Sequence, residues 1–151
     1  MQFRVPQCVT PAGLSAAEAI ELHHFADASQ RGYGTASYIR TVSATGEIHC
    51  SLLTSRAHLA PIKSVSIPRL ELTAAKLAVQ VNMELTRALE VSTPRVWFWT
   101  DSTAVLKYIK NETTRYHVFV ANRLSVIHDG SSMEIRALKG EPSRLRVARH
   151  G

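Results

Sequence analysis

The order of hydrophobic patterns along the chain limits its fold more than any other feature of the sequence. Three stretches alternate their residues between two faces, as β-strands do: Glu21–Asp27, Tyr33–Arg40 and Glu47–Leu53. Because short turns join them, we expect them to form an antiparallel meander. A long helical pattern follows, and after it a short, nearly all-apolar run. This order predicts a mixed sheet of the α/β class.

The helical pattern begins near Pro68, which suits the first turn of a helix because proline lacks an N–H. Its apolar positions recur at helical spacing and are Leu70, Ala74, Leu77, Val81, Leu85 and Ala88. The basic segment Ser55–Ile67 before it is expected to be a loop. Val96–Thr100 after it is typical of a strand with helices on both faces. A strand that follows such a crossover should lie parallel to a strand of the meander.

The second half of the chain is expected to add two helices, ending near Lys110 and His128, and a last strand at Met133–Leu138. The helices can be capped by polar side chains, namely Asp101 or Ser102 for the first and Thr113 or Thr114 for the second. The predicted fold is therefore an antiparallel three-strand meander plus parallel strands. The expected strand order is 3-2-1-4(-5), with helices on both faces.

Composition narrows the function classes. The net charge is +6 and the pI is near 9.7, a balance that favours binding to polyanions such as nucleic acid. Two cysteines, Cys8 and Cys50, cannot make a disulfide framework or a zinc site. Cys50 alternates with Ile48 and Leu52, so we interpret it as a small core residue. No apolar run suits a membrane span or a signal peptide, and we expect an intracellular protein.

Three carboxylates stand at special points of this layout. Asp27 ends the first strand, Asp101 ends the strand after the crossover, and Glu71 lies in the expected first turn of the crossover helix. If those strands are parallel neighbours, Asp27 and Asp101 emerge side by side, at the edge where α/β sheets bind ligands. Oxygen ligands without His or Cys suit Mg²⁺ or Mn²⁺. Each acid alone could instead be a turn residue, a helix cap or a residue that interacts favourably with the helix dipole.

Five short motifs resemble the RNase H domains of BEL/Pao retrotransposons, in the same order and at similar spacing. They extend over most of the chain, from about Val5 to Asp129, and are His24-Phe25-Ala26-Asp27-Ala28-Ser29 with Gly32-Tyr33-Gly34, Ser55-Arg56 with Ala60-Pro61-Ile62-Lys63, Ile67-Pro68-Arg69-Leu70-Glu71-Leu72, Trp99-Thr100-Asp101-Ser102 and Phe119-Val120-Ala121-Asn122-Arg123. The resemblance implies an RNase H-like fold and cleavage of RNA in RNA–DNA hybrids. It also implies a reverse transcriptase domain in the same polyprotein and, for an intact element, a cytoplasmic virus-like particle.

The resemblance also implies roles for individual residues. Asp27 would bridge two Mg²⁺ (or Mn²⁺) ions, while Glu71 and Asp101 would each hold one of them. Independently of the family, three cations flank Glu71 in the sequence, and we expect them to contact backbone phosphates: Arg56, Lys63 and Arg69. An aspartic peptidase is excluded for this segment, because Asp101-Ser102-Thr103 lacks the glycine of the peptidase loop.

The C-terminal tail departs from the family pattern. The family's fourth carboxylate lies in a stretch resembling Asn-Pro-Ala-Asp, and nothing similar occurs here. Shifted forward by one nucleotide, degenerate codons from Met133 to Gly151 permit that string, so we expect the tail to be translated out of frame. We therefore divide the chain into a lead-in from the reverse transcriptase (1–20), the RNase H-like domain (21–132) and an atypical tail (133–151). We expect impaired catalysis; a non-catalytic nucleic-acid-binding remnant or a structural module remains open.

Overall fold

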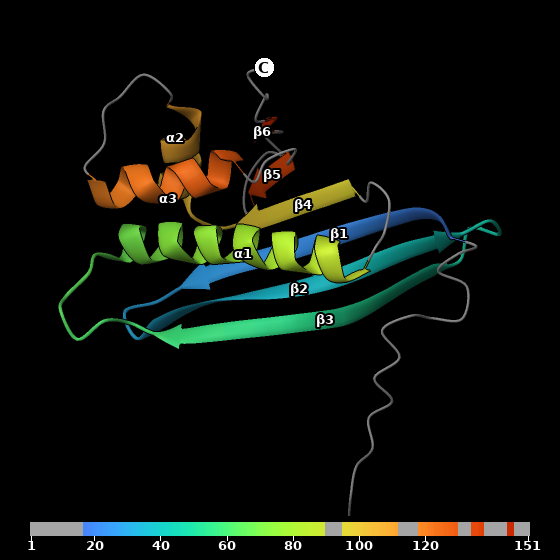
Figure 1. Cartoon of the computed structure of the whole chain (residues 1–151), viewed down its shortest axis with the longest axis horizontal. Coiled ribbons are helices and arrows are strands. Elements are labelled where there is room, and N and C mark those ends of the chain that lie inside the picture. Colours follow the sequence, from blue (N-terminus) through green and yellow to red (C-terminus); the bar gives the residue numbers. More distant parts are fainter. Residues whose placement is uncertain (1–16, 90–94, 112–117, 130–133, 138–144, 147–151) are drawn as a thin grey trace, which may run out of the picture.

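The computed structural model describes residues 17–89, 95–111, 118–129, 134–137 and 145–146. In chain order its elements are β1 (Ala17–Ala28), β2 (Gly32–Ser43), β3 (Ile48–Leu59), α1 (Ile67–Leu89), β4 (Arg95–Thr100), α2 (Thr103–Lys110), α3 (Val118–Asp129), β5 (Glu134–Ala137) and β6 (Leu145–Arg146). Figure 1 shows the strands side by side, with α1 lying along the sheet. None of the described helices has the length and apolar character needed to cross a membrane.

The sheet has six described strands in the order β3-β2-β1-β4-β5-β6. β2 pairs antiparallel with both β1 and β3, which makes the expected meander. β4 runs parallel to β1 on one side and to β5 on the other. The predicted order 3-2-1-4 and the mixed character of the sheet are therefore confirmed, and β5 lies within the segment that we expected to form the last strand.

Several boundaries differ from the prediction, because pairing with a neighbour extends a strand beyond its own sequence pattern. β1 begins at Ala17, inside the expected lead-in, where Ala17 lies opposite Ser43. β3 continues to Leu59 along β2, so Arg56 lies in a strand opposite Thr35 and not in a loop. Ser102 caps α2 as expected, its hydroxyl accepting the Val105 N–H. The expected caps of the next helix, Thr113 and Thr114, lie outside the described residues.

One face of the sheet is covered by helices, and we call it the helix-covered face. Its core joins α1, β1, β4, α2 and α3 through buried apolar side chains: Ala26, Leu72, Ala74, Ala78, Val79, Phe98, Val105, Leu106, Ile109, Leu124 and Ile127. The helix-covered face also buries a polar cluster. The ring of buried His24 makes hydrogen bonds with Ser37 Oγ at 2.7 Å and with Asn82 Oδ1 at 3.0 Å. Burial lowers the pKa of His24 to about 4.

The opposite face carries aromatic side chains, and we call it the aromatic face. Cross-strand register brings together His23, Phe25, Tyr38, Trp97 and Trp99. Phe25 stacks on Trp99 with ring centroids 5.9 Å apart and meets Tyr38 edge-on at 5.8 Å. In the described part of the chain, α1, α2 and α3 share the core of the other face (Figure 1). The expectation of helices on both faces is thus met on one face only within these residues.

Cys50 lies on the aromatic face, opposite Arg40, and is exposed. Its neighbours in the alternating pattern, Ile48 and Leu52, are 57% and 54% exposed. The interpretation of Cys50 as a core residue is therefore wrong, because the alternation correctly gave a shared face but not whether that face is covered. Cys8 lies outside the described residues.

Candidate active site

Asp27 and Asp101 lie at the ends of two neighbouring parallel strands. Ala26 of β1 is the register partner of Thr100 of β4. Asp27 follows Ala26 within β1, and Asp101 follows Thr100 directly after the end of β4. Parallel neighbours lie about 4.8 Å apart, so the two aspartates are brought to the same point of the sheet edge. Both residues are exposed, and the Asp27 carboxylate accepts the N–H of Ala28 at 2.8 Å.

Glu71 reaches the same region from α1, just after that helix's first turn rather than in it. The hydroxyl of Ser102, the residue after Asp101, donates a hydrogen bond to Glu71 Oε2. The same hydroxyl accepts the Val105 N–H at 3.2 Å, and the Ser102 N–H is held by Thr100 Oγ1 at 3.1 Å. One residue, Ser102, therefore links the end of β4 through its backbone N–H, and the start of α2 and the carboxylate of α1 through its hydroxyl.

The donor chemistry of these acids fits Mg²⁺ or Mn²⁺, because all three offer carboxylate oxygens. Their present arrangement is looser than a formed site: among the described residues, no three His, Cys, Asp or Glu side chains are grouped so that they could hold one metal ion. Asp27, Glu71 and Asp101 share one end of the sheet, and Glu71 Oε2 is engaged by Ser102. The assignment of these residues as metal ligands therefore stays a prediction.

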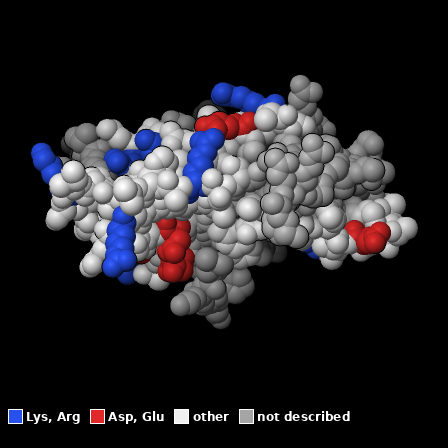
Figure 2. Space-filling model, turned by 90° about the horizontal axis from the view of Figure 1, so that it is seen from below, with Lys and Arg blue, Asp and Glu red and all other residues white. Residues whose placement is uncertain are grey.

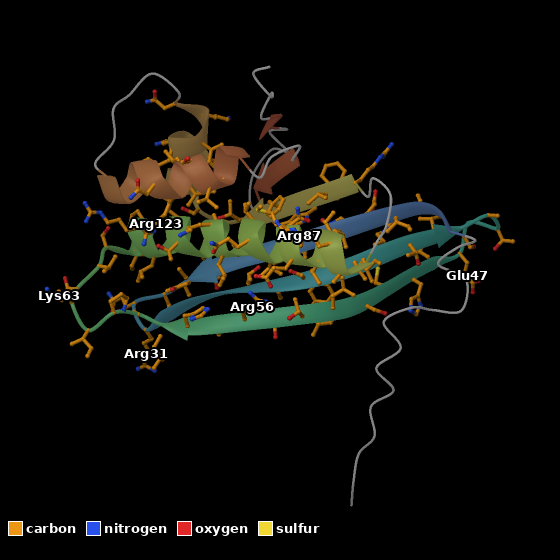
Figure 3. The ribbon with its side chains drawn as sticks, in the orientation of Figure 1. Arg31, Glu47, Arg56, Lys63, Arg87 and Arg123 are labelled. Carbon is orange, nitrogen blue, oxygen red and sulfur yellow. The ribbon has the colours of Figure 1, made fainter. Side chains whose placement is uncertain are left out.

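The predicted phosphate contacts do not form one group. Arg56 lies in β3 and makes an ion pair with Glu84 of α1 across the helix-covered face. Lys63 lies in the segment between β3 and α1 and is exposed, and Arg69 lies at the start of α1. In Figure 3, Lys63 lies at the same end of the molecule as Arg31 and Arg123, whereas Arg56 lies farther along the sheet.

Basic side chains are spread over the surface seen in Figure 2. Most of the blue side chains lie in one half of that view, the half that corresponds to the left of Figure 1. White and red atoms separate them from one another, so they make a scattered field rather than one continuous patch. That half includes the end of the molecule toward which β1, β3 and β4 run (Figure 1).

A hollow beside Asp27 was missed by reasoning from the sequence. It lies between the β1–β2 turn and the last residues of β3, has a volume of about 480 Å³, and is lined among others by Asp27, Ser29, Arg31, Tyr33 and His58. The ring of Tyr33 stacks on that of His58 with centroids 5.4 Å apart. The paired glycines Gly32 and Gly34, which also line the hollow, mark a close approach of β2 to β3, since a Cβ on either would lie 2.5–2.7 Å from a carbonyl oxygen of β3.

Solved structures share this fold at low sequence identity. The chain matches the LC11 RNase H1, crystallised with an RNA/DNA hybrid, with a TM-score of 0.50 and 9% identity over 81% of this chain and 86% of that chain. It matches the prototype foamy virus protease–reverse transcriptase with a TM-score of 0.52 and 14% identity, over 82% of this chain and 18% of that chain. For the NurA nuclease of Sulfolobus solfataricus the TM-score is 0.50, the identity 8% and the coverage 81% and 48%.

These likenesses and the strand order define the fold as RNase H-like. The chain belongs to the Pao retrotransposon-like RNaseH-like domain family, which matches residues 1–102, a range that includes Asp27, Glu71 and Asp101. The family resemblance stated from the sequence motifs is confirmed. Comparison with curated proteins gives no match.

Proposed function

We propose that this chain is a metal-dependent ribonuclease H domain of a retrotransposon reverse transcriptase, that it acts on the RNA strand of RNA–DNA hybrids, and that its catalysis is impaired. One observation carries the proposal: Asp27 and Asp101 follow the register partners Ala26 and Thr100, and Ser102 ties Glu71 to the same point. The family and the fold support it. The solved RNase H1 bound to an RNA/DNA hybrid and the foamy virus reverse transcriptase support the substrate and the partner domain.

In this proposal Asp27, Glu71 and Asp101 would hold Mg²⁺ (or Mn²⁺). When bound, the ions would supply an activated water and stabilise the leaving oxygen. The residues themselves position the ligands: the Ala28 N–H orients the Asp27 carboxylate, and the Ser102 hydroxyl orients Glu71. Lys63 and Arg69 would contact backbone phosphates, and Arg56 would do so by exchanging its ion pair with Glu84.

Impairment follows from the missing fourth carboxylate. Its loss removes one ligand from the ion that activates water, so we expect little or no cleavage even where the other ion binds. A non-catalytic nucleic-acid-binding remnant is the second candidate function. The looseness of the acid group in the described residues favours it.

Metal binding separates the two candidates. Isothermal titration of the full chain with Mn²⁺ should show binding that D27N and D101N abolish and that the control E47Q, at the opposite end of the molecule (Figure 3), leaves intact. Cleavage of a labelled hybrid with Mg²⁺ should be weak or absent. No Mn²⁺ binding would leave the remnant as the better reading, and rapid cleavage would overturn the impairment.

The tail has its own test. We propose that residues 133–151 are read out of frame, although Glu134–Ala137 pair as β5 with β4. Sequencing the gene decides this: stop codons in the shifted frame, or the absence of codons for Asn-Pro-Ala-Asp, would end the idea.

A further inference from the structure

We propose that the outer edge of β3 is a dimer interface, at which residues 48–52 pair antiparallel with the same residues of a second copy of this chain. Among the described strands the sheet ends at β3, which has β2 on one side and no described strand on the other. Figure 1 shows β3 as the outermost strand, on the side away from β4 and β5. The proposal does not rest on the proposed nuclease, because it uses none of the three carboxylates.

The edge of β3 lacks most of the features that keep edge strands from pairing with other chains. An edge strand leaves part of its backbone N–H and C=O groups without a partner strand, and proteins usually protect it with charges, proline, bulges or a short length. β3 is 12 residues long, and residues 48–55 include no Asp, Glu, Lys, Arg or Pro. Ile48, Cys50 and Leu52 are all exposed. This edge is therefore suited to accept a further strand.

A bulge limits the part of β3 that can pair. Its register with β2 is regular over residues 48–52 and then shifts, since Tyr38 lies opposite Leu52 but Ser37 lies opposite Thr54. One extra residue of β3 therefore stands between these two pairs, and a bulge bends and twists a strand. The regular segment ends at this bulge on one side and at the β2–β3 turn on the other, so it is the segment that a straight partner strand can follow.

The regular segment is complementary to itself. A two-fold axis through Cys50, perpendicular to the sheet, places Ile48 of one copy opposite Leu52 of the other, and does so twice. These two side chains are 57% and 54% exposed in one copy, and apolar pairs across strands stabilise antiparallel sheets. The same axis places His49 opposite Ser51, and their side chains are compatible, since they already contact each other at 3.1 Å within one copy. A second copy thus matches this edge residue for residue, as a two-fold interface requires.

The charges near the segment do not oppose this contact. Arg40, opposite Cys50 on β2, is paired with Glu21 at 2.8 Å. Arg56 lies beyond the bulge and is paired with Glu84 of α1. Each copy still carries a net charge of +6, and salt screens the repulsion between copies. Because one strand pair is smaller than a standard interface of about 1,600 Å², the dimer should be weak and its population should depend on concentration.

Sedimentation equilibrium of the full chain, at high salt and with a reductant, should show a monomer–dimer equilibrium. L52K puts a charge opposite Ile48 twice in each dimer, so it should raise the dimer Kd at least about tenfold. The control L59K adds the same charge to the same strand outside the paired segment, at a leucine that is 88% exposed, and should leave the Kd unchanged. A chain that remains monomeric up to about 1 mM, or equal effects of L52K and L59K, would overturn the interface.

A charge swap tests the register. I48E and L52K should each associate poorly with themselves, but mixed together they place a carboxylate opposite an ammonium across the two-fold axis and should form a heterodimer. The matched mixture of L52E with L52K should not, because Leu52 does not face Leu52 in this register. A heterodimer in the second mixture and none in the first would overturn the axis through Cys50. Circular dichroism of each variant checks that the fold is kept, which the exposure of both positions leads us to expect.

Discussion

The two faces of the sheet use their residues in opposite ways. On the helix-covered face, α1 buries small and aliphatic side chains completely, and even the polar positions His24 and Ser37 are closed off from water. On the aromatic face, large rings pack mainly against one another, while Tyr38 and Leu52 remain 38% and 54% exposed. Strands β1, β2 and β4 contribute to both faces, so the difference in burial follows from α1 packing on one of them.

The contrast shows which face of the sheet contributes more to the stability of the fold. Complete burial beneath α1 makes each side chain of the helix-covered face costly to change. The aromatic face gains from ring contacts but leaves part of its apolar area, including Ile48 and Leu52, exposed to water. Asp27 continues the aromatic face at its end, since it follows His23 and Phe25 at alternate positions of β1.

The largest expected effect is on the helix-covered face. Leu72 is 0% exposed, and L72A should lower the free energy of unfolding by about 2–5 kcal/mol, because it leaves a cavity in the core. The matched variant L52A, on the aromatic face, should cost less than about 1 kcal/mol. Urea denaturation measures both. Similar losses for the two leucines would abolish the contrast between the faces.

The second prediction concerns the loss of folding stability at low pH. Buried His24 has a pKa of about 4 in the folded chain against 6.5 when exposed, so the unfolded chain takes up a proton first as the pH falls. The stability that neutral His24 contributes is complete above pH 6.5 and is lost toward pH 4, by up to about 3 kcal/mol. H24Q should flatten the dependence of unfolding free energy on pH, and H49Q, an exposed histidine of β3, should not. Identical pH profiles for wild type and H24Q would contradict this.

The third prediction concerns the rings. F25A removes the stack on Trp99 and the edge contact with Tyr38, and should lower the free energy of unfolding by about 1–2 kcal/mol. The loss should lie between those of L72A and L52A, because Phe25 is half-buried. A loss as large as that of L72A would mean that the aromatic face is as closed as the other.

The smallest effect is expected for an ion pair at the border. Arg56 and Glu84 join β3 to α1 on the helix-covered side, but both are exposed to water. R56A should shift the urea midpoint by less than the error of measurement, in low and high salt alike, because solvent screens such pairs. A clear loss that salt removes would show that the pair helps to hold α1 on the sheet.

The sequence was sufficient to predict the order of the elements and the placement of Asp27 and Asp101 at the ends of neighbouring parallel strands, because both follow from chain topology. It was insufficient to predict which face of the sheet the helices cover. In β1 both alternating sets, one with Leu22 and one with Phe25, contain apolar residues, so alternation could not tell which set α1 would cover. The length of β3 depends on pairing with β2, and the pattern in residues 54–59 gave no sign of it. The hollow at Arg31 arises where two strands and a turn come together, which no local pattern encodes.

The single hydroxyl of Ser102 has a consequence for how events at the sheet edge can be observed. The hydroxyl can donate one hydrogen bond, which goes to the Glu71 carboxylate, while its oxygen accepts a hydrogen bond from the Val105 N–H. If the Glu71 carboxylate moves away, the Ser102 hydroxyl keeps its proton but loses its acceptor and is free to rotate, which changes the orientation of the lone pair that accepts the Val105 N–H in the first turn of α2. The amide of Val105 thus acts as a reporter of Glu71: its rate of hydrogen exchange registers, in a helix that supplies none of the three acids, when the carboxylate changes its partner.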